Sequence, residues 1–134
     1  RLLVFIDTNI LIYHLEANPE LGAKASARLA ALHAAGAQVV VSDLIRLECR
    51  VGPLKSGDAV LLSRYDGFFS LPSVEIVYLT AAVCDRAAII RAGYGFRTPD
   101  ALNLAAAVES GCGLFLTHDA RLGRFHELNV EALP

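Results

Sequence analysis

The sequence predicts an α/β fold, namely a three-layer α/β/α sandwich with a mostly parallel sheet of four to five strands. Short runs of consecutive apolar residues alternate with longer helical segments along the whole chain. An unbroken apolar run, such as residues 2–6, is typical of a strand buried on both faces, as strands of parallel sheets are. Strands that alternate with helical segments favour right-handed crossovers that cover the sheet with helices.

Each predicted strand is a short apolar segment that polar residues, glycine or proline separate from its neighbours. The first strand opens the chain, the second follows Gly36, and the third follows Pro72. These apolar segments are only a few residues long, which suits strands, because helices usually run over ten or more residues. The predicted strands cover residues 2–6, 38–41, 74–79 and 114–117, with a short last strand at 128–130.

The predicted helices are delimited by residues that cap or stop helices. Thr8, Ser42 and Thr80 stand before helical segments, where a hydroxyl oxygen can accept a bond from a first-turn N–H group. Gly52 and Pro53 are expected to end the third helix, since proline removes a backbone donor. The predicted helices cover residues 10–18, 20–35, 43–51, 56–69, 81–92, 100–109 and 119–125.

Composition places the chain among globular proteins. Its 134 residues are expected to form one domain over residues 1–134, and 54% of them are apolar. No apolar run approaches the roughly 20 residues that span a bilayer, and no signal-peptide pattern opens the chain. The three cysteines lack the paired spacing of zinc sites. We therefore expect a cytoplasmic protein without a membrane partner.

Four acidic residues occupy positions that a parallel sheet would bring together. Asp7 follows the first predicted strand by one residue, Asp119 follows the fourth by two, and Asp100 lies in the first turn of a helix. The carboxyl ends of parallel strands meet at one edge, where functional groups collect. Taken singly, each aspartate also has an ordinary explanation, because acidic residues are favoured at helix starts.

Glu48 is the fourth acid, and its helix position sets it apart. It shares a predicted helix face with Leu44, Ile45 and Val51, where a carboxylate is costly unless it is paired or binds a metal. Converging like charges repel unless a cation holds them together. Hard oxygen ligands suit Mg²⁺ or Mn²⁺, and such a site supports phosphodiester hydrolysis by a metal-activated water.

Charge outside these four acids is mildly basic. The net charge is −2, from 12 basic and 14 acidic residues, so removing the four acids leaves 12 − 10 = +2. A basic surface is compatible with a nucleic-acid partner, although an ordinary solvated surface explains the same charges.

Four short motifs in this order resemble the PIN domain, and within it the VapC-type ribonuclease toxins of toxin–antitoxin pairs. The motifs are Asp7-Thr8-Asn9, Glu48 in the helix after Val41-Ser42-Asp43, Thr98-Pro99-Asp100-Ala101 and Thr117-His118-Asp119. The resemblance covers nearly the whole chain. It implies an endoribonuclease dependent on Mg²⁺ or Mn²⁺, with RNA as substrate, a cognate antitoxin as partner and a homodimer as assembly.

The resemblance also implies roles for individual residues. The predicted catalytic and metal-binding residues are Asp7, Glu48, Asp100 and Asp119. The predicted polar supports are Thr8, Asn9 and Thr117. Candidate contacts to RNA phosphates are Arg46, Arg50, Arg97 and Arg121, each of which could equally be a solvated surface cation.

Alternative functions of the same fold class remain open at this point. A PIN-fold nuclease of RNA processing carries the same acids, and a non-cleaving RNA- or protein-binding module shares the architecture. A phosphorylation-dependent receiver domain would need adjacent acids after the first strand and a lysine near the end of the chain. Here Thr8 follows Asp7, and the two lysines lie in the first half of the chain, which disfavours that reading.

Overall fold

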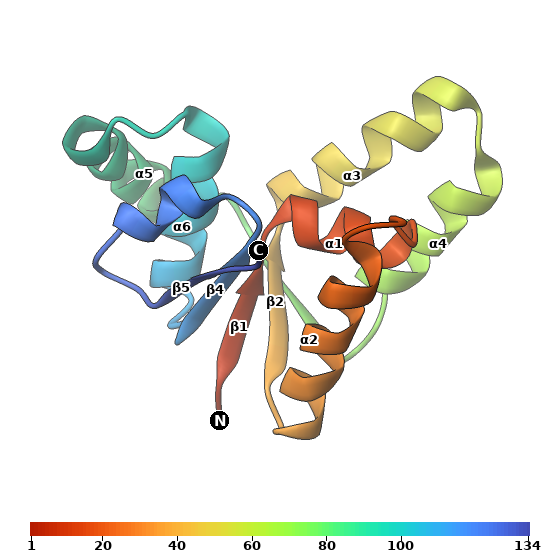
Figure 1. The fold of residues 1–134 in the computed structure, drawn as a ribbon. Helices are drawn as coiled ribbons and strands as arrows, with labels where there is room; N and C mark the ends of the chain where they lie inside the picture. Colours follow the sequence, from red (N-terminus) through yellow and green to blue (C-terminus); the bar gives the residue numbers. More distant parts are fainter.

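Five parallel strands form the centre of the structure, a computed structural model that describes all 134 residues (Figure 1). The strands are β1 (Leu3–Ile6), β2 (Gln38–Ser42), β3 (Val74–Val77), β4 (Leu114–Thr117) and β5 (Val130–Ala132). Their order across the sheet is β3-β2-β1-β4-β5, and every neighbouring pair is parallel. The predicted parallel sheet is thus confirmed, with five strands.

Helices cover both faces of this sheet, so the predicted three-layer arrangement is also confirmed. The helices are α1 (Thr8–Leu15), α2 (Gly22–Ala34), α3 (Asp43–Ser56), α4 (Ala59–Phe69), α5 (Ala81–Tyr94) and α6 (Thr98–Glu109), with a short 3₁₀ helix η1 (Ala120–Arg124). Figure 1 shows α1 to α4 on one side of the sheet and α5 and α6 on the other. None of these helices has the length and apolar character needed to cross a membrane.

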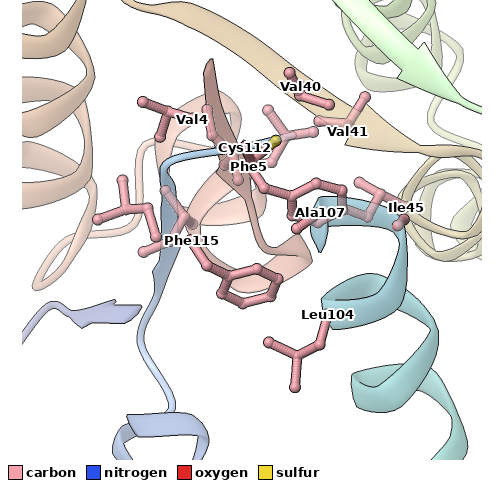
Figure 2. Close-up of a cluster of buried hydrophobic side chains, with 14 of the residues drawn as sticks. Val4, Phe5, Val40, Val41, Ile45, Leu104, Ala107, Cys112 and Phe115 are labelled. Carbon is pink, nitrogen blue, oxygen red and sulfur yellow. The ribbon is translucent and has the colours of Figure 1, made fainter. Parts of the chain in front are cut away.

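The core lies between the central strands and the helices packed on them. Phe5 of β1 and Phe115 of β4 are register partners, and their rings stack with centroids 5.2 Å apart. Leu104 and Ala107 of α6 lie in the same buried cluster, as Figure 2 shows. Burial of this apolar surface is the main term that stabilises the fold.

Helix α6 is the most deeply buried helix, and it is rich in alanine. Ala101, Ala105, Ala106 and Ala107 have no exposed surface, because small side chains let the helix lie close to the sheet. Pro99 lies in the first turn, where its missing N–H costs nothing. This close packing fixes the position of the helix start, which faces the carboxyl edge of the sheet.

Several helix boundaries differ by two or three residues from the prediction, and the junction between α3 and α4 differs in its stop signal as well. Helix α3 was expected to end at Gly52 and Pro53, but it continues to Ser56 with Pro53 inside it. Its actual stop is Gly57, whose positive φ of 69° suits a left-handed C-cap, and whose N–H donates to the Pro53 carbonyl. Helix α4 therefore starts at Ala59 rather than at residue 56, capped by the Asp58 side chain.

Capping was predicted correctly at two helices and incorrectly at a third. Ser42 and Thr80 accept bonds from Ile45 N and Val83 N, as expected. The N-cap of α1 is Asp7 and not Thr8, whose hydroxyl is engaged elsewhere.

The end of the chain also differs from the prediction. The segment expected as a helix over 119–125 is a 3₁₀ helix over Ala120–Arg124, capped by the Asp119 side chain. The last strand runs over Val130–Ala132 instead of 128–130, because Phe115 N bonds to the Asn129 carbonyl and sets the register two residues later.

Candidate functional site

The candidate site lies at the carboxyl edge of the sheet, between β1 and β4. Strand β2 lies on one side of β1, and β4 lies on its other side. The direction in which the chain winds through the sheet therefore reverses between β1 and β4. Ligands of open α/β sheets bind at such a reversal. Asp7 N donates to the Leu116 carbonyl at 2.9 Å, so the backbone holds the end of β1 against β4.

All four predicted acids line one cavity of about 310 Å³ at this edge. They come from four different parts of the fold, namely the end of β1, α3, the start of α6 and the loop after β4. The lining residues are Asp7, Thr8, Asn9, Ile12, Glu48, Arg97, Pro99, Asp100, Asn103 and Asp119. The structure thus brings together residues that lie up to 112 positions apart in the sequence.

Asp7 is the most buried of the four acids, with 6% of its surface exposed. Its two carboxylate oxygens accept bonds from Thr8 N at 2.9 Å and from the Thr117 hydroxyl at 2.7 Å. Burial raises the pKa of Asp7 to about 6, the two hydrogen bonds lower it, and the neighbouring charges of Asp100 and Glu48 raise it. An ionised Asp7 is therefore costly without a cation.

Glu48 reaches the cavity from α3 and is held by a side chain of α1. The Thr8 hydroxyl donates to Glu48 Oε1 at 2.8 Å. Of the apolar residues expected on the same face, Ile45 is fully buried, but Val51 is 46% exposed. The expected apolar face is therefore buried only in the first part of the helix. Glu48 is half-buried, and its side chain lines the cavity.

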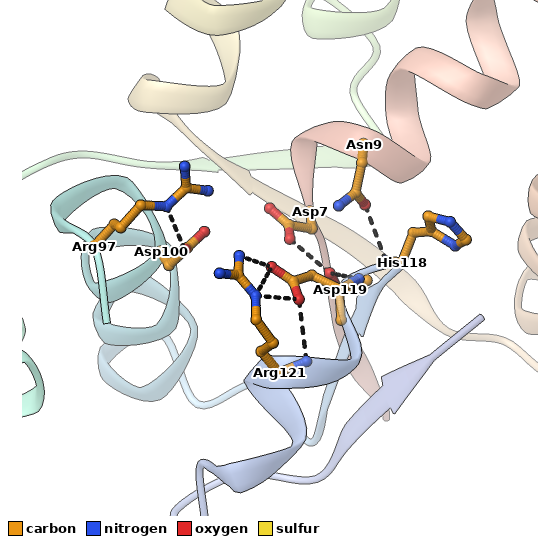
Figure 3. A network of polar contacts seen from close by, with 8 residues as sticks. Asp7, Asn9, Arg97, Asp100, His118, Asp119 and Arg121 are labelled. Carbon is orange, nitrogen blue, oxygen red and sulfur yellow. Dashed lines mark hydrogen bonds and ion pairs between the residues drawn. The ribbon is translucent and has the colours of Figure 1, made fainter. Parts of the chain in front are cut away.

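Asp119 and Asp100 differ from the other two acids because each has an arginine partner. Arg121 forms a forked contact with both oxygens of Asp119, and the closest distance, from Nη2 to Oδ2, is 2.6 Å. This guanidinium holds the pKa of Asp119 below its ordinary value. Arg97 lies 3.5 Å from Asp100, as Figure 3 shows.

The acids surround a cavity without closing into a ligand shell. No group of three histidine, cysteine, aspartate or glutamate side chains is arranged to hold a metal ion. The arrangement is therefore an open ring of carboxylates around solvent-accessible space, with two members uncompensated and two paired to arginines.

The three predicted supporting residues all contact the site. Thr117 is fully buried; its hydroxyl donates to Asp7 and accepts from Asp119 N at 3.0 Å, so one side chain orients two acids. Asn9 accepts a bond from His118 N at 3.1 Å, which fixes the loop after β4 against α1 (Figure 3). These contacts and the bond from Thr8 to Glu48 join three of the four acid-bearing segments, namely the end of β1, α3 and the loop after β4.

The four arginines predicted to contact phosphates divide into two pairs. Arg97 lines the cavity, and Arg121 lies beside it in a smaller hollow of about 80 Å³ that also contains Arg97. Arg50 pairs with Asp66 of α4, and the Arg46 guanidinium lies 5.6 Å from the centre of the Phe69 ring. Neither Arg46 nor Arg50 is among the residues that line the cavity.

Asn103 is a cavity residue that the sequence reasoning did not identify. It is 2% exposed, and its Oδ1 accepts a bond from the Ser42 hydroxyl at 2.7 Å. A signal was available, since Asn103 lies three residues after Asp100 and so shares its helix face. Because the amide oxygen is engaged by Ser42, the amide nitrogen is the group free to donate in the cavity.

Comparisons with known proteins agree with this architecture. A model of the PIN domain family matches residues 4–128. No curated protein sequence matches the chain significantly.

Among solved structures, VapBC2 from Rickettsia felis, bound to a DNA fragment from its promoter, is similar with a TM-score of 0.80 and 20% identity, covering 98% of each chain. A toxin–antitoxin complex from Klebsiella pneumoniae gives a TM-score of 0.71 and 24% identity, covering 93% of this chain and 94% of that one. VapC20 from Mycobacterium tuberculosis, described as a toxin that cleaves the sarcin–ricin loop, gives a TM-score of 0.68 and 16% identity, covering 84% and 86%. At these identities the likeness concerns the fold.

Proposed function

The chain belongs to the PIN domain family, and from this membership and its carboxylate cavity we propose that it is a divalent-metal-dependent endoribonuclease, the toxin of a toxin–antitoxin pair. The observation that carries the proposal is the convergence of Asp7, Glu48, Asp100 and Asp119 on one cavity. Their like charges would repel in so small a space, and a cation relieves that repulsion.

The donor set fits Mg²⁺ or Mn²⁺. Both ions prefer carboxylate oxygens, and Mg²⁺ keeps several of its waters while it binds only one or two carboxylates. A closed shell of three acids is therefore unnecessary, and a cavity of about 310 Å³ has room for a hydrated ion. Asp7 and Asp100 are the ligands we assign first, with Glu48 and Asp119 beside them. When bound, the ion would activate a water and stabilise the charge of the leaving oxygen.

The residues of the chain would prepare the site for this chemistry. Thr117 and the Thr8 backbone hold both oxygens of Asp7, so the carboxylate is fixed before any ligand arrives. Thr8 holds Glu48 in the same way through its hydroxyl. Fixed donors need no rearrangement during the reaction, which is the main electrostatic advantage of an enzyme over water.

The RNA substrate would approach along the side of the cavity that carries cations. Arg97 and Arg121 provide guanidinium groups suited to phosphate oxygens. The Asn103 amide, which lies within the cavity wall, would add a neutral donor. A nucleic-acid substrate is further supported by the fold shared with VapC20, which is described as a toxin that cleaves the sarcin–ricin loop.

The proposal includes a cognate antitoxin as partner and a homodimer as assembly. Folds similar to this chain occur in complexes from Rickettsia felis and Klebsiella pneumoniae that contain an antitoxin. Leu47, Val51 and Leu54 of α3 are 60%, 46% and 59% exposed at helical spacing, and exposed apolar surface of this kind supports a protein partner.

A second candidate function is a PIN-fold module that binds RNA or protein without cutting it. One observation favours it, namely that Asp100 and Asp119 already have arginine partners. A PIN-fold nuclease of RNA processing would share the acids and the chemistry, so it differs from the first proposal in its RNA target and in having no antitoxin.

The decisive experiment is cleavage of a panel of single-stranded and stem–loop RNAs by the purified protein, in Mg²⁺, in Mn²⁺ and with chelator. We expect cleavage that needs the metal and that Asp7→Asn abolishes. Asp85→Asn is the matched control, because Asp85 is exposed on α5 and makes no side-chain hydrogen bond. Cleavage that survives in chelator or in Asp7→Asn would refute the metal-dependent mechanism, and an RNA that binds but stays intact would favour the non-cleaving module.

A further inference from the structure

Two of the four acids in the cavity already have cationic partners within the chain. Arg121 contacts Asp119 through three N–O pairs of 2.6 to 3.2 Å, and Arg97 lies 3.5 Å from Asp100 (Figure 3). Asp7 and Glu48, by contrast, are held by hydroxyl and backbone donors and form no ion pair. The acids therefore divide into a neutralised pair and an uncompensated pair.

The arginines are exposed, whereas their carboxylates are not. The side chains of Arg97 and Arg121 are 72% and 66% exposed, but those of Asp100 and Asp119 are 16% and 22% exposed. Neither arginine side chain donates a hydrogen bond to any other residue. Exposed ion pairs contribute little to stability, so both guanidinium groups can leave without disturbing the core.

The charges at the site match this division. Four carboxylates facing two guanidinium groups leave a net charge of −2, which one divalent cation would balance. Both arginines lie on the same side of the cavity as the carboxylates that they neutralise. A cation that enters the cavity therefore meets two carboxylates that already pair with positively charged arginines.

We infer that Arg97 and Arg121 are internal counter-ions that compete with the divalent cation for Asp100 and Asp119, and that cation binding releases them to contact RNA phosphates. The inference rests on the proposed function and adds a coupling between its two ligands. Toward the cation each arginine is a positioning residue, since it acts there through a carboxylate, and toward the RNA it is a direct contact. Metal and RNA then favour each other's binding, because the metal frees the groups that the RNA needs.

Arg121 should be the stronger competitor of the two. Its forked contact engages both oxygens of Asp119, whereas Arg97 approaches one oxygen of Asp100 at a longer distance. Substitution should spare the local fold in both cases. The Arg121 backbone N–H bonds to Asp119 whatever side chain is present, and Arg97 makes no side-chain capping bond to α6.

The first test is Mn²⁺ binding without RNA, measured from the electron paramagnetic resonance signal of the free ion. Coulomb's law gives about a tenfold change for a unit charge about 6 Å from a dication in water, so we expect Arg121→Gln to tighten Mn²⁺ binding about tenfold. Arg97→Gln should tighten it by about threefold. The control is Arg28→Gln, which removes the same charge from a forked pair with Glu131 outside the cavity, and it should leave the affinity unchanged.

The second test is RNA binding by fluorescence anisotropy, with Ca²⁺ as the dication and again with chelator. Arg121→Gln should weaken RNA binding several-fold in Ca²⁺ and hardly at all in chelator, where Arg121 is engaged by Asp119. Arg121→Lys should restore part of the affinity, because it keeps the charge without the fork. An equal loss in both conditions would mean an ordinary phosphate contact and would overturn the coupling.

The outcomes separate this inference from the proposed function. If the wild-type protein cleaves RNA with Mn²⁺ but both arginine variants bind Mn²⁺ as the wild type does, the counter-ion role is wrong and the nuclease stands. If the wild-type protein binds no Mn²⁺ at all, both the metal dependence and the competition are wrong.

Discussion

Replacing Asp7 by asparagine should stabilise the protein when no divalent cation is present. Asp7 is 6% exposed and carries no cationic partner, so its ionised form is disfavoured in the folded state. Its pKa rises from 3.8 to about 6, which corresponds to about 3 kcal/mol of unfolding free energy at about 1.36 kcal/mol per pKa unit. Asparagine has nearly the same shape and no charge to bury.

Part of this gain is offset by a lost hydrogen bond. The amide oxygen can still accept from Thr8 N, but an amide NH₂ cannot accept the proton that the Thr117 hydroxyl donates to Asp7. One such bond is worth about 1 kcal/mol, so the net gain is about 2 kcal/mol near pH 7.5. With an unfolding entropy of about 2.1 cal/mol/K per residue over 134 residues, this corresponds to a rise in Tm of about 7 °C.

The pH dependence identifies the cause of the effect. A carboxyl whose folded pKa is raised binds more protons folded than unfolded between about pH 4 and pH 6, so its contribution to stability falls as pH rises through this range. Near pH 4 Asp7 is protonated in the folded protein, and the advantage of Asp7→Asn should disappear. Urea unfolding of both proteins with chelator, at pH 4 and pH 7.5, measures the difference directly, with Asp85→Asn as control.

A clear result would refute this reasoning. If Asp7→Asn were equally or less stable than the wild type at pH 7.5 with chelator, then the carboxylate of Asp7 would not be under electrostatic stress. The same conclusion would follow if the stability difference did not change between the two pH values.

Three further outcomes follow from the same geometry. A hundredfold excess of Mg²⁺ over its dissociation constant should raise the unfolding free energy of the wild type by about 2.7 kcal/mol, whereas Asp7→Asn should respond much less, as thermal melts with and without Mg²⁺ would reveal. Thr117→Val should lower the unfolding free energy by about 1–3 kcal/mol at pH 7.5, because it leaves a buried carboxylate short of a donor. For the same reason it should raise the pKa of Asp7 further. NMR titration of the Asp7 carboxyl measures this pKa, and an unchanged value would contradict the prediction. Thr8→Val should free Glu48 and slow RNA cleavage by about tenfold or more with little loss of stability, whereas unchanged cleavage kinetics would remove Glu48 from the mechanism.

Sequence patterns predicted the central strands well because β1 and β4 are almost entirely buried. The apolar runs at β1 and β4 are continuous, and the acids that follow them could be placed at one edge from topology alone. Asp100 and Glu48 were harder to place, since their positions depend on how α6 and α3 pack. Glu48 was identified because a carboxylate is unusual on an apolar helix face. The first-turn position of Asp100 is ordinary, and the resemblance of its motif to the PIN domain made it a candidate.

Features that depend on side-chain choice among several partners could not be predicted. Thr8 looked like an N-cap, but its hydroxyl bonds to Glu48, and Asp7 caps α1 instead. The sequence also did not predict that Asp100 and Asp119 each pair with an arginine. Arg97 and Arg121 were identified as cations near the site, but sequence spacing alone does not say which carboxylate an exposed arginine will choose.

The alanine face of α6 makes the site sensitive to changes far from its acids. Ala105 and Ala106 have no exposed surface, and their methyl groups set how near the helix axis lies to the strands. A larger side chain at either position would lift the helix and carry Asp100 and Asn103 outward with it. Substitutions that look harmless, such as alanine to valine one or two turns below the cavity, should therefore inactivate the protein although none of the four acidic residues is replaced.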